Sequence, residues 1–357
     1  MALETMVDRD LCVQAADRAL AYLRERVLDD TWVAAHRDIA YYFKAPQAFL
    51  LAGLRDEAAA AFDALEPFLD EGGAASGSAA YRLAYPHYPY MWAAKAAREL
   101  GRTEVAAACD ARLSEWQAFR PCGVVVGGDA DLFATAMRAF NALTFGRLEE
   151  AKSAADVLVW AVDRQMWQEC AQRHDGSRLV DLTKFRLRWD AATTNTDALE
   201  AWISPPAEGG LPSVFYEVDR TQPGQLYFML AFPAMVLLEL YARGRDDEGE
   251  RGRAYRYCGT AARILAFLRG CDGINESLFA HKAAVAAAMV GEHYGEDDLP
   301  PAISRYLVSQ QRAHGGNADD ADAMDTVDQT AEIACWLRML PELAAATQPA
   351  SWTVAGF

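Results

Sequence analysis

The stretch Pro89–Glu104, PYMWAAKAARELGRTE, shows the pattern on which the fold prediction rests. Its apolar, alanine-rich part predicts a helix, and Gly101 directly after it is typical of a left-handed helix C-terminus. Charged residues follow at once and begin a second, amphipathic segment. Four other apolar segments stop in the same way, before Gly53, Gly146, Gly244 and Gly291. The repeated unit is therefore an apolar helix, a tight turn and an amphipathic helix.

Six helices of each kind are predicted from the spacing of apolar residues. A helix that is apolar nearly all round is buried, and one with a polar face meets water. We therefore expect an all-α domain over residues 1–357, with six inner and six outer helices closed into an (α/α)6 barrel. The inner helices are expected near 45–52, 89–100, 131–145, 225–242, 277–290 and 327–340, and the outer ones near 10–27, 55–69, 103–118, 148–164, 252–269 and 299–311.

Closure of the barrel rests on the connections between these helices. A repeat of about 45 residues is also found in open helical solenoids. The inner-to-outer turns are uniformly short, however, and the outer-to-inner connections are uniformly long. This asymmetry favours a closed toroid over a solenoid.

The largest interruption of the helical pattern covers residues 165–224. Alternating apolar and polar residues in Phe185–Trp189 and Val214–Val218 predict short strands, in the form of a small β-hairpin. A long insertion within a compact domain is typical of a lid or of the wall of a site. We therefore expect a lid-like insertion.

Composition narrows the classes of partner. A formal net charge of −17 disfavours nucleic acid and anionic membrane surfaces, and no segment is apolar enough to span a bilayer. Seven cysteines without a CxxC pair, and no visible secretory signal, favour a cytoplasmic protein with reduced thiols. The expected partner is a small-molecule substrate, and assembly into a homo-oligomer is left open.

Two segments resemble the QW repeats of the terpenoid cyclases and protein prenyltransferases. They are Ala16–Leu23 and Ile303–Gln311, the second leading into Gly315 and Gly316. Asn317 stands where the closing Trp of the repeat is expected, and the DxDD and DDxxD acidic boxes are absent. The resemblance implies an α/α toroid around a central cavity. In size and pattern the chain is also similar to linalool dehydratase/isomerase, a cofactor-free family that adds or removes water in a buried cavity.

Reactive side chains gather in the long loops before the inner helices, whose N-termini supply partial positive charge. Asp38 is the predicted general acid or base, tuned by desolvation. His281, Tyr88, His87 and Cys170 are the other catalytic candidates. We expect Asp38, the aromatic cluster at 85–90 and His281 to line one pocket. The expected substrate-binding residues are His36, Tyr41, Tyr42, Tyr90, Trp92, Asp129, Trp189, Tyr216, Tyr227 and Asp328.

Each candidate also has a structural alternative. Asp129 and Asp328 could cap helices, His281 could be a hydrogen-bonded core residue, and Cys170 could be a small buried apolar residue. No cluster has the ligand spacing of a zinc site, and GxSxG, P-loop, GxGxxG and HExxH motifs are absent. We therefore expect neither a metal nor a cofactor.

Three functions follow from this pattern. The first is a cofactor-independent lyase, isomerase or cyclase of secondary metabolism, which acts by acid–base chemistry on an isoprenoid or polyketide-like molecule in the cavity. Aromatic residues at the inner-helix starts favour it, because ring faces stabilise cationic intermediates. The second is a carbohydrate enzyme, a sugar epimerase or uronyl hydrolase, using His87, His281, Asp129, Arg188 and Trp189. The third is a non-catalytic ligand-binding barrel.

Overall fold

A computed structural model describes most of the chain, namely residues 6–70, 87–115, 118–119, 123–126, 129–163, 169–171, 173–174, 217–294 and 298–345. The chain divides into two compact units, one of residues 1–115 with 304–343 and one of residues 116–303 with 344–357. The described residues of both units are mostly helical, which confirms the predicted all-α class. None of the described helices is long and apolar enough to cross a membrane.

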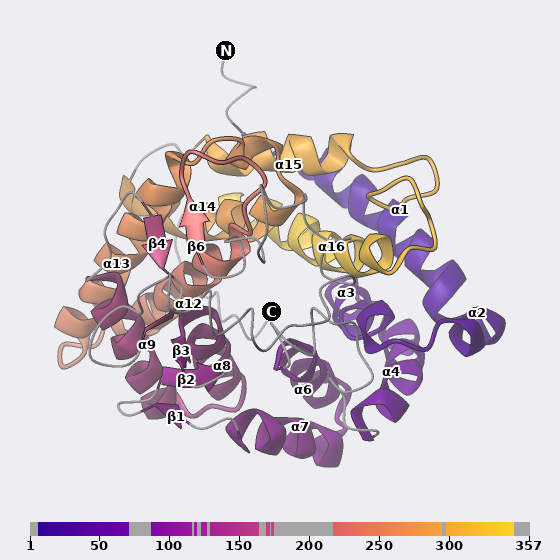
Figure 1. Ribbon diagram of the computed structural model, residues 1–357, viewed down its shortest axis with the longest axis horizontal. Helices are drawn as coiled ribbons and strands as arrows, with labels where there is room; N and C mark the ends of the chain where they lie inside the picture. The colour runs from indigo at the N-terminus through magenta and orange to yellow at the C-terminus, as the bar shows by residue number, and fades with distance from the viewer. Residues whose placement is uncertain are drawn as a thin grey trace, which may run out of the picture. The chain divides into compact units, whose positions relative to one another are not determined.

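The first unit is built from helical pairs in which α3 packs on α4 and α6 packs on α7. Left-handed glycines end α3 and α6, with φ of 75° at Gly53 and 81° at Gly101. Its elements (Figure 1) are α1 (Arg9–Val27), α2 (Asp30–Ala35), the 3-10 helix η1 (Ile39–Tyr41), α3 (Ala45–Leu51), α4 (Arg55–Asp70), α6 (Tyr88–Leu100), α7 (Thr103–Glu115) and, up to Leu343, α16 (Met324–Ala345). The helix α15 (Leu299–Ser309) is divided between the two units at Ser304.

The second unit centres on α12, which packs on α8, α13 and α14 (Figure 1). The pair α8 and α9 is joined by a left-handed turn at Gly146, with φ of 76°. Its helices are α8 (Leu132–Thr144), α9 (Leu148–Val162), α12 (Phe228–Gly244), α13 (Arg251–Arg269), the 3-10 helices η4 (Ile274–Glu276) and η5 (Leu278–Ala280), and α14 (His281–Tyr294).

The described residues of the second unit include two small antiparallel sheets. The first has the strand order β1-β2-β3-β5, with Val125 of β2 opposite Ala130 of β3. The second pairs β4 with β6, with Cys170 opposite Val218. The strands are β1 (Ala118–Phe119), β2 (Gly123–Val126), β3 (Asp129–Asp131), β4 (Glu169–Ala171), β5 (Arg173–His174) and β6 (Glu217–Asp219).

All predicted helices of both kinds are present, and their burial follows the prediction. Every residue of α6 from Tyr88 to Ala97 and of α12 from Phe228 to Tyr241 is buried. By contrast, α1, α9 and α13 bury one face each. The alternation of fully buried and half-buried helices therefore holds along both units.

Three details of the sequence prediction are wrong. Gly291 lies inside α14, and Gly244 is the last residue of α12 without a left-handed backbone, so neither is a left-handed cap. The four-stranded sheet is not predicted by the helical pattern, which also places the end of the outer helix at residue 118, whereas α7 ends at Glu115. The β-branched run of β2 carried that signal. Of the predicted hairpin, β6 confirms a strand at 217–218, and Phe185–Trp189 lies outside the described residues.

The segment Ile303–Gln311, which resembles a QW repeat, ends in a residue that holds the loop after α15 against α1 by hydrogen bonds. Gln311 Nε2 donates to the carbonyl oxygens of Ala15 and Gly315, both at 2.9 Å, and Arg18 Nε donates to Gln311 Oε1 at 2.8 Å. Gly315 has a φ of 96°, and a Cβ added there would lie 2.5 Å from the Arg18 carbonyl oxygen. Only glycine fits this approach of the loop to α1.

Replacing Gly315 by Ala should lower the free energy of unfolding by roughly 2–3 kcal/mol, because the Cβ strains a left-handed backbone and meets the Arg18 carbonyl. Gly259→Ala in α13 is the matched control. A Cβ added at Gly259 would meet open space. We therefore expect the free energy of unfolding to rise by about 0.5–1 kcal/mol. Urea unfolding measures both changes. Wild-type stability of the Gly315→Ala variant would show that the loop moves off α1 without cost.

Candidate functional site

A buried group of charged side chains lies in the first unit, where α3, α6 and α16 carry it. Lys44 Nζ lies 2.7 Å from Asp328 Oδ2 and 2.5 Å from Glu332 Oε2. The Tyr88 hydroxyl donates to Glu332 Oε1 at 2.7 Å. The side chains of Lys44, Asp328 and Glu332 are only 2%, 0% and 4% exposed. We call these four residues, Lys44, Tyr88, Asp328 and Glu332, the Lys44 cluster.

Helix geometry places the members of the Lys44 cluster. Lys44 is the N-cap of α3, and Tyr88 is the first residue of α6. Asp328 and Glu332 are four residues apart on α16 and therefore share one helix face. The cluster thus joins three helix faces that are all buried, and each charged group finds its partner on another helix.

Electrostatics fix the protonation of two members. Burial by itself acts to lower the pKa of Lys44, but the Asp328 and Glu332 carboxylates outweigh it and raise that pKa above its usual value. Burial raises the pKa of Tyr88 well above its usual value, and the neighbouring Glu332 carboxylate raises it further. At neutral pH the cluster therefore holds an ammonium group and a protonated phenol against carboxyl groups.

Aromatic rings surround the Lys44 cluster. Lys44 Nζ lies 5.2 Å from the centre of the Tyr88 ring, and Trp92 packs edge-on against that ring at 6.1 Å. Trp336 Nε1 lies 3.4 Å from Glu332 Oε1. The arrangement combines a carboxylate that can accept a proton with a phenol that can donate a hydrogen bond, in apolar surroundings.

Asp38, the predicted general acid or base, has a structural role in the first unit. Its Oδ1 accepts a hydrogen bond from the Ala40 amide at 2.9 Å, as the N-cap of η1. The side chain is half-buried. This is the bond that an Asp N-cap makes at the start of a helix.

Three predicted substrate-binding residues pack around Trp32. The His36 ring stacks on the Trp32 ring with centroids 4.0 Å apart. The Tyr41 ring packs edge-on against the Trp32 ring, with centroids 5.1 Å apart. The Tyr42 hydroxyl donates to the His36 carbonyl oxygen at 2.5 Å. These contacts hold the segment between α2 and α3 in place. Packing therefore explains why His36, Tyr41 and Tyr42 occupy these positions.

Three residues of the predicted aromatic cluster, His87, Tyr88 and Tyr90, are buried at the start of α6, and its fourth member, Tyr85, lies outside the described residues. His87 is the N-cap residue of α6, and Tyr90 and Trp92 lie in its first turns. Of the predicted residues, the structure brings Tyr88 and Asp328 together in the Lys44 cluster. Asp328 is therefore part of an ion pair and not a helix cap.

His281 and Tyr227 lie in the second unit, at the starts of α14 and α12. His281 Nδ1 is 2.6 Å from the Leu278 carbonyl oxygen, and its Nε2 is 3.2 Å from Lys282 Nζ. The Tyr227 hydroxyl donates to the Asp272 carbonyl oxygen at 2.7 Å, and burial raises the pKa of Tyr227 to about 12. Both residues have hydrogen bonds that suit a core position. Convergence of His281 with Asp38 stays a prediction.

Four other candidates have no described side chain. The backbones of Cys170 and Asp129 belong to β4 and β3. Asp129 therefore begins a strand and does not cap a helix. Trp189 and Tyr216 lie outside the described residues.

Lys44 and Glu332 complete the cluster but were not among the predicted site residues. The signal that could have found Glu332 is a charged residue inside a helix predicted to be buried all round. Lys95 in α6 and Glu239 in α12 carry the same signal, and both are buried. A charge in such a helix needs a partner from another element or from the next turn.

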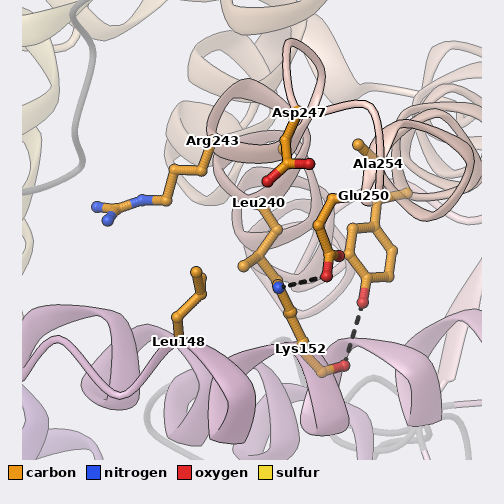
Figure 2. Close-up of a pocket in the computed structure, with 9 residues that line it drawn as sticks. Leu148, Lys152, Leu240, Arg243, Asp247, Glu250 and Ala254 are labelled. Atoms are coloured by element: carbon orange, nitrogen blue, oxygen red, sulfur yellow. Dashed lines mark hydrogen bonds and ion pairs between the residues drawn. The ribbon is translucent and has the colours of Figure 1, made fainter.

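A small pocket in the second unit lies among α9, α12 and α13 (Figure 2). Its volume is about 60 Å³, which is room for a few water molecules. Lys152 Nζ crosses to Glu250 Oε1 at 2.9 Å, and the Tyr257 hydroxyl donates to the Lys152 carbonyl oxygen at 3.2 Å. Arg243 is paired with Glu239 at 2.6 Å. We assign these contacts to the packing of the helices.

Within the described part of the chain, no group of three or more His, Cys, Asp or Glu residues is arranged to hold a metal ion. No family model, no curated protein and no solved structure matches this chain.

Lys44→Met should lower the free energy of unfolding by about 3–5 kcal/mol, since it removes the ammonium group from two buried carboxyl groups. Arg9→Met is the control, because Arg9 and its partner Glu342 are 68% and 48% exposed and such a pair contributes about 1 kcal/mol or less. Urea unfolding compares the two variants. A similar decrease in the free energy of unfolding for both variants would contradict a large contribution of the buried ion pair to stability.

Asp38→Ala should lower the free energy of unfolding by about 1 kcal/mol, because the Ala40 amide loses its acceptor. Asp38→Asn keeps an acceptor oxygen and should remain close to wild type. Thermal denaturation followed by circular dichroism separates the two variants. An Asp38→Ala variant as stable as wild type would argue against the cap.

Proposed function

We propose that the chain is an enzyme that acts by acid–base chemistry, without a cofactor, on a mostly apolar small molecule, as a lyase, isomerase or cyclase. The observation that supports this proposal is the Lys44 cluster. Burial of ionised groups is costly, and replacing them by apolar residues is often neutral or stabilising for the fold alone. Strongly perturbed ionisable groups gather at functional sites, which favours a chemical role for the cluster.

Glu332 is the proposed base. Lys44 holds its Oε2 and Tyr88 donates to its Oε1, so the carboxylate has a fixed orientation. Tyr88, whose pKa is raised, keeps its proton. Once Glu332 has taken a proton from the substrate, the Tyr88 hydroxyl turns from Glu332 and donates its hydrogen bond to the negative charge that develops on a substrate oxygen. Lys44 and Asp328 are positioning residues. A well-placed proton-transfer group contributes roughly 10²–10⁴-fold to the rate.

The aromatic surroundings of the cluster support an apolar substrate that bears one oxygen function. Trp92, Trp336 and the ring of Tyr88 offer apolar faces next to the polar groups. An isoprenoid or polyketide-like alcohol or ketone matches that combination. Ring faces also stabilise a cationic intermediate formed when a hydroxyl group leaves.

The (α/α)6 barrel and its likeness to the terpenoid cyclase and prenyltransferase toroids belong to the same proposal. Its support is the alternation of buried and half-buried helices within each unit. A cytoplasmic location is also proposed, because the five cysteines whose side chains are described carry thiols and not disulfides. The carbohydrate alternative rests partly on Arg188 and Trp189, which lie outside the described residues.

The test measures conversion and proton exchange together. A panel of acyclic isoprenoid alcohols and polyketide-like ketones is incubated with the protein in D2O, and products and deuterium uptake are measured by mass spectrometry. Glu332→Gln and Tyr88→Phe should each lower kcat by about 100-fold or more. The control Glu342→Gln, at an exposed position of α16, should not change it.

Circular dichroism at the assay temperature checks that each variant is folded. Turnover by folded Glu332→Gln within a few-fold of wild type would remove Glu332 from the mechanism. Failure of the wild-type protein to convert or deuterate any member of the panel would contradict the proposed substrate class.

A further inference from the structure

Lysine is rare in this chain, and the described lysines are all buried. Of 34 basic residues only five are lysines, namely Lys44, Lys95, Lys152, Lys184 and Lys282. The four of these whose side chains are described are all buried, with 1–7% exposure. Arginine, which cannot lose its proton in a protein, supplies the remaining positive charge. A lysine at a buried position offers what arginine cannot, a primary amine that can become a nucleophile.

Lys95 lies in α6 beside groups that suit such chemistry. Its Nζ pairs with Glu99, one turn further along the helix, and the Glu99 side chain is 30% exposed. The amine is therefore buried, whereas its carboxylate partner reaches solvent. Gln47 Nε2 of α3 lies 3.4 Å from Glu99 Oε2. Gln47 Oε1 is a buried acceptor without a hydrogen-bond partner among the described residues.

The pKa of Lys95 is shifted in the opposite direction from the pKa values of Lys44 and Lys152. Burial lowers the pKa of Lys95, and the Glu99 carboxylate offsets this only in part. Burial also acts to lower the pKa values of Lys44 and Lys152, but their carboxylate partners outweigh it and raise both pKa values. Lys44 is held by two buried carboxyl groups, and Lys152 by Glu149 and Glu250.

We propose that Lys95 is a reactive amine that binds a small aldehyde or ketone covalently, as a protonated imine paired with Glu99. The site consists of Gln47, Lys95 and Glu99. Its chemistry goes beyond the acid–base function of the Lys44 cluster and does not rest on it.

Imine formation at this site needs only the carbonyl compound and the side chains of Lys95, Glu99 and Gln47. Lys95 first gives a proton to Glu99, and the neutral amine attacks the carbonyl carbon to form a carbinolamine. Gln47 Oε1 accepts a hydrogen bond from the new hydroxyl group. Glu99 returns its proton to that hydroxyl group, which leaves as water while the C=N bond forms. The product is a cation, so the ion pair with Glu99 is retained. A carbamate formed with CO2 would instead place two anions together.

Reductive trapping tests the proposal on the folded wild-type protein. Propionaldehyde and, separately, acetone are added with sodium cyanoborohydride at neutral pH, and modified lysines are quantified by peptide mass mapping over time. We expect Lys95 to be alkylated at least about tenfold faster than Lys44 and Lys152, which are the internal controls. Alkylation of Lys95 no faster than that of Lys44 would overturn the proposal.

The pH profile and two variants complete the test. The alkylation rate at Lys95 should level off at a lower pH than that of a free lysine side chain in the same solution, and a profile like that of free lysine would overturn the proposal. Lys95→Arg keeps the charge and should lose this product. The Glu332→Gln variant should still be alkylated at Lys95 at the wild-type rate. Alkylation at Lys95 therefore tests this proposal separately from the acid–base function of the Lys44 cluster.

Discussion

The ion pair of Lys44 with Asp328 and Glu332 is the contact on which the first unit depends. Lys44 and Asp328 are 284 residues apart in the sequence, yet both side chains are almost fully excluded from solvent. A buried charge without its partner costs several kcal/mol. The start of α3 therefore has to meet one face of α16, and Tyr88 brings α6 to the same place through Glu332.

This constraint also explains why α16 contains acidic residues although it is buried on all sides from Thr326 to Leu337. Apolar residues in place of all the ionised groups together would pack there at similar or lower cost, whereas one apolar residue alone would leave a buried charge without its partner. The carboxyl groups are tolerated because Lys44 and Tyr88 satisfy them. The interior of the first unit thus keeps polar groups whose positions are fixed by their partners. Fixed polar groups in apolar surroundings are what acid–base catalysis requires.

The candidate site was partly predictable. Tyr88 and Asp328 stood out as reactive residue types near the starts of buried helices, and both belong to the Lys44 cluster. Asp38 stood out for the same reason, but its carboxylate caps η1, because a local amide two residues away is an available donor. Glu332 stands out only as a charged residue in a helix predicted to be buried all round, and nothing near it in the sequence marks its partner. The identity of that partner depends on contacts between distant segments.

The sequence by itself determined the six inner and six outer helices and three of the left-handed glycine turns, at Gly53, Gly101 and Gly146. Helical periodicity and glycine caps are local properties, since they depend on residues within one or two turns. Only the tertiary structure decided the pairing of β4 with β6 and the partners of Lys44, Gln311 and Gly315. These contacts join segments far apart in the chain, and their free energy depends on burial and on distances that no local pattern encodes.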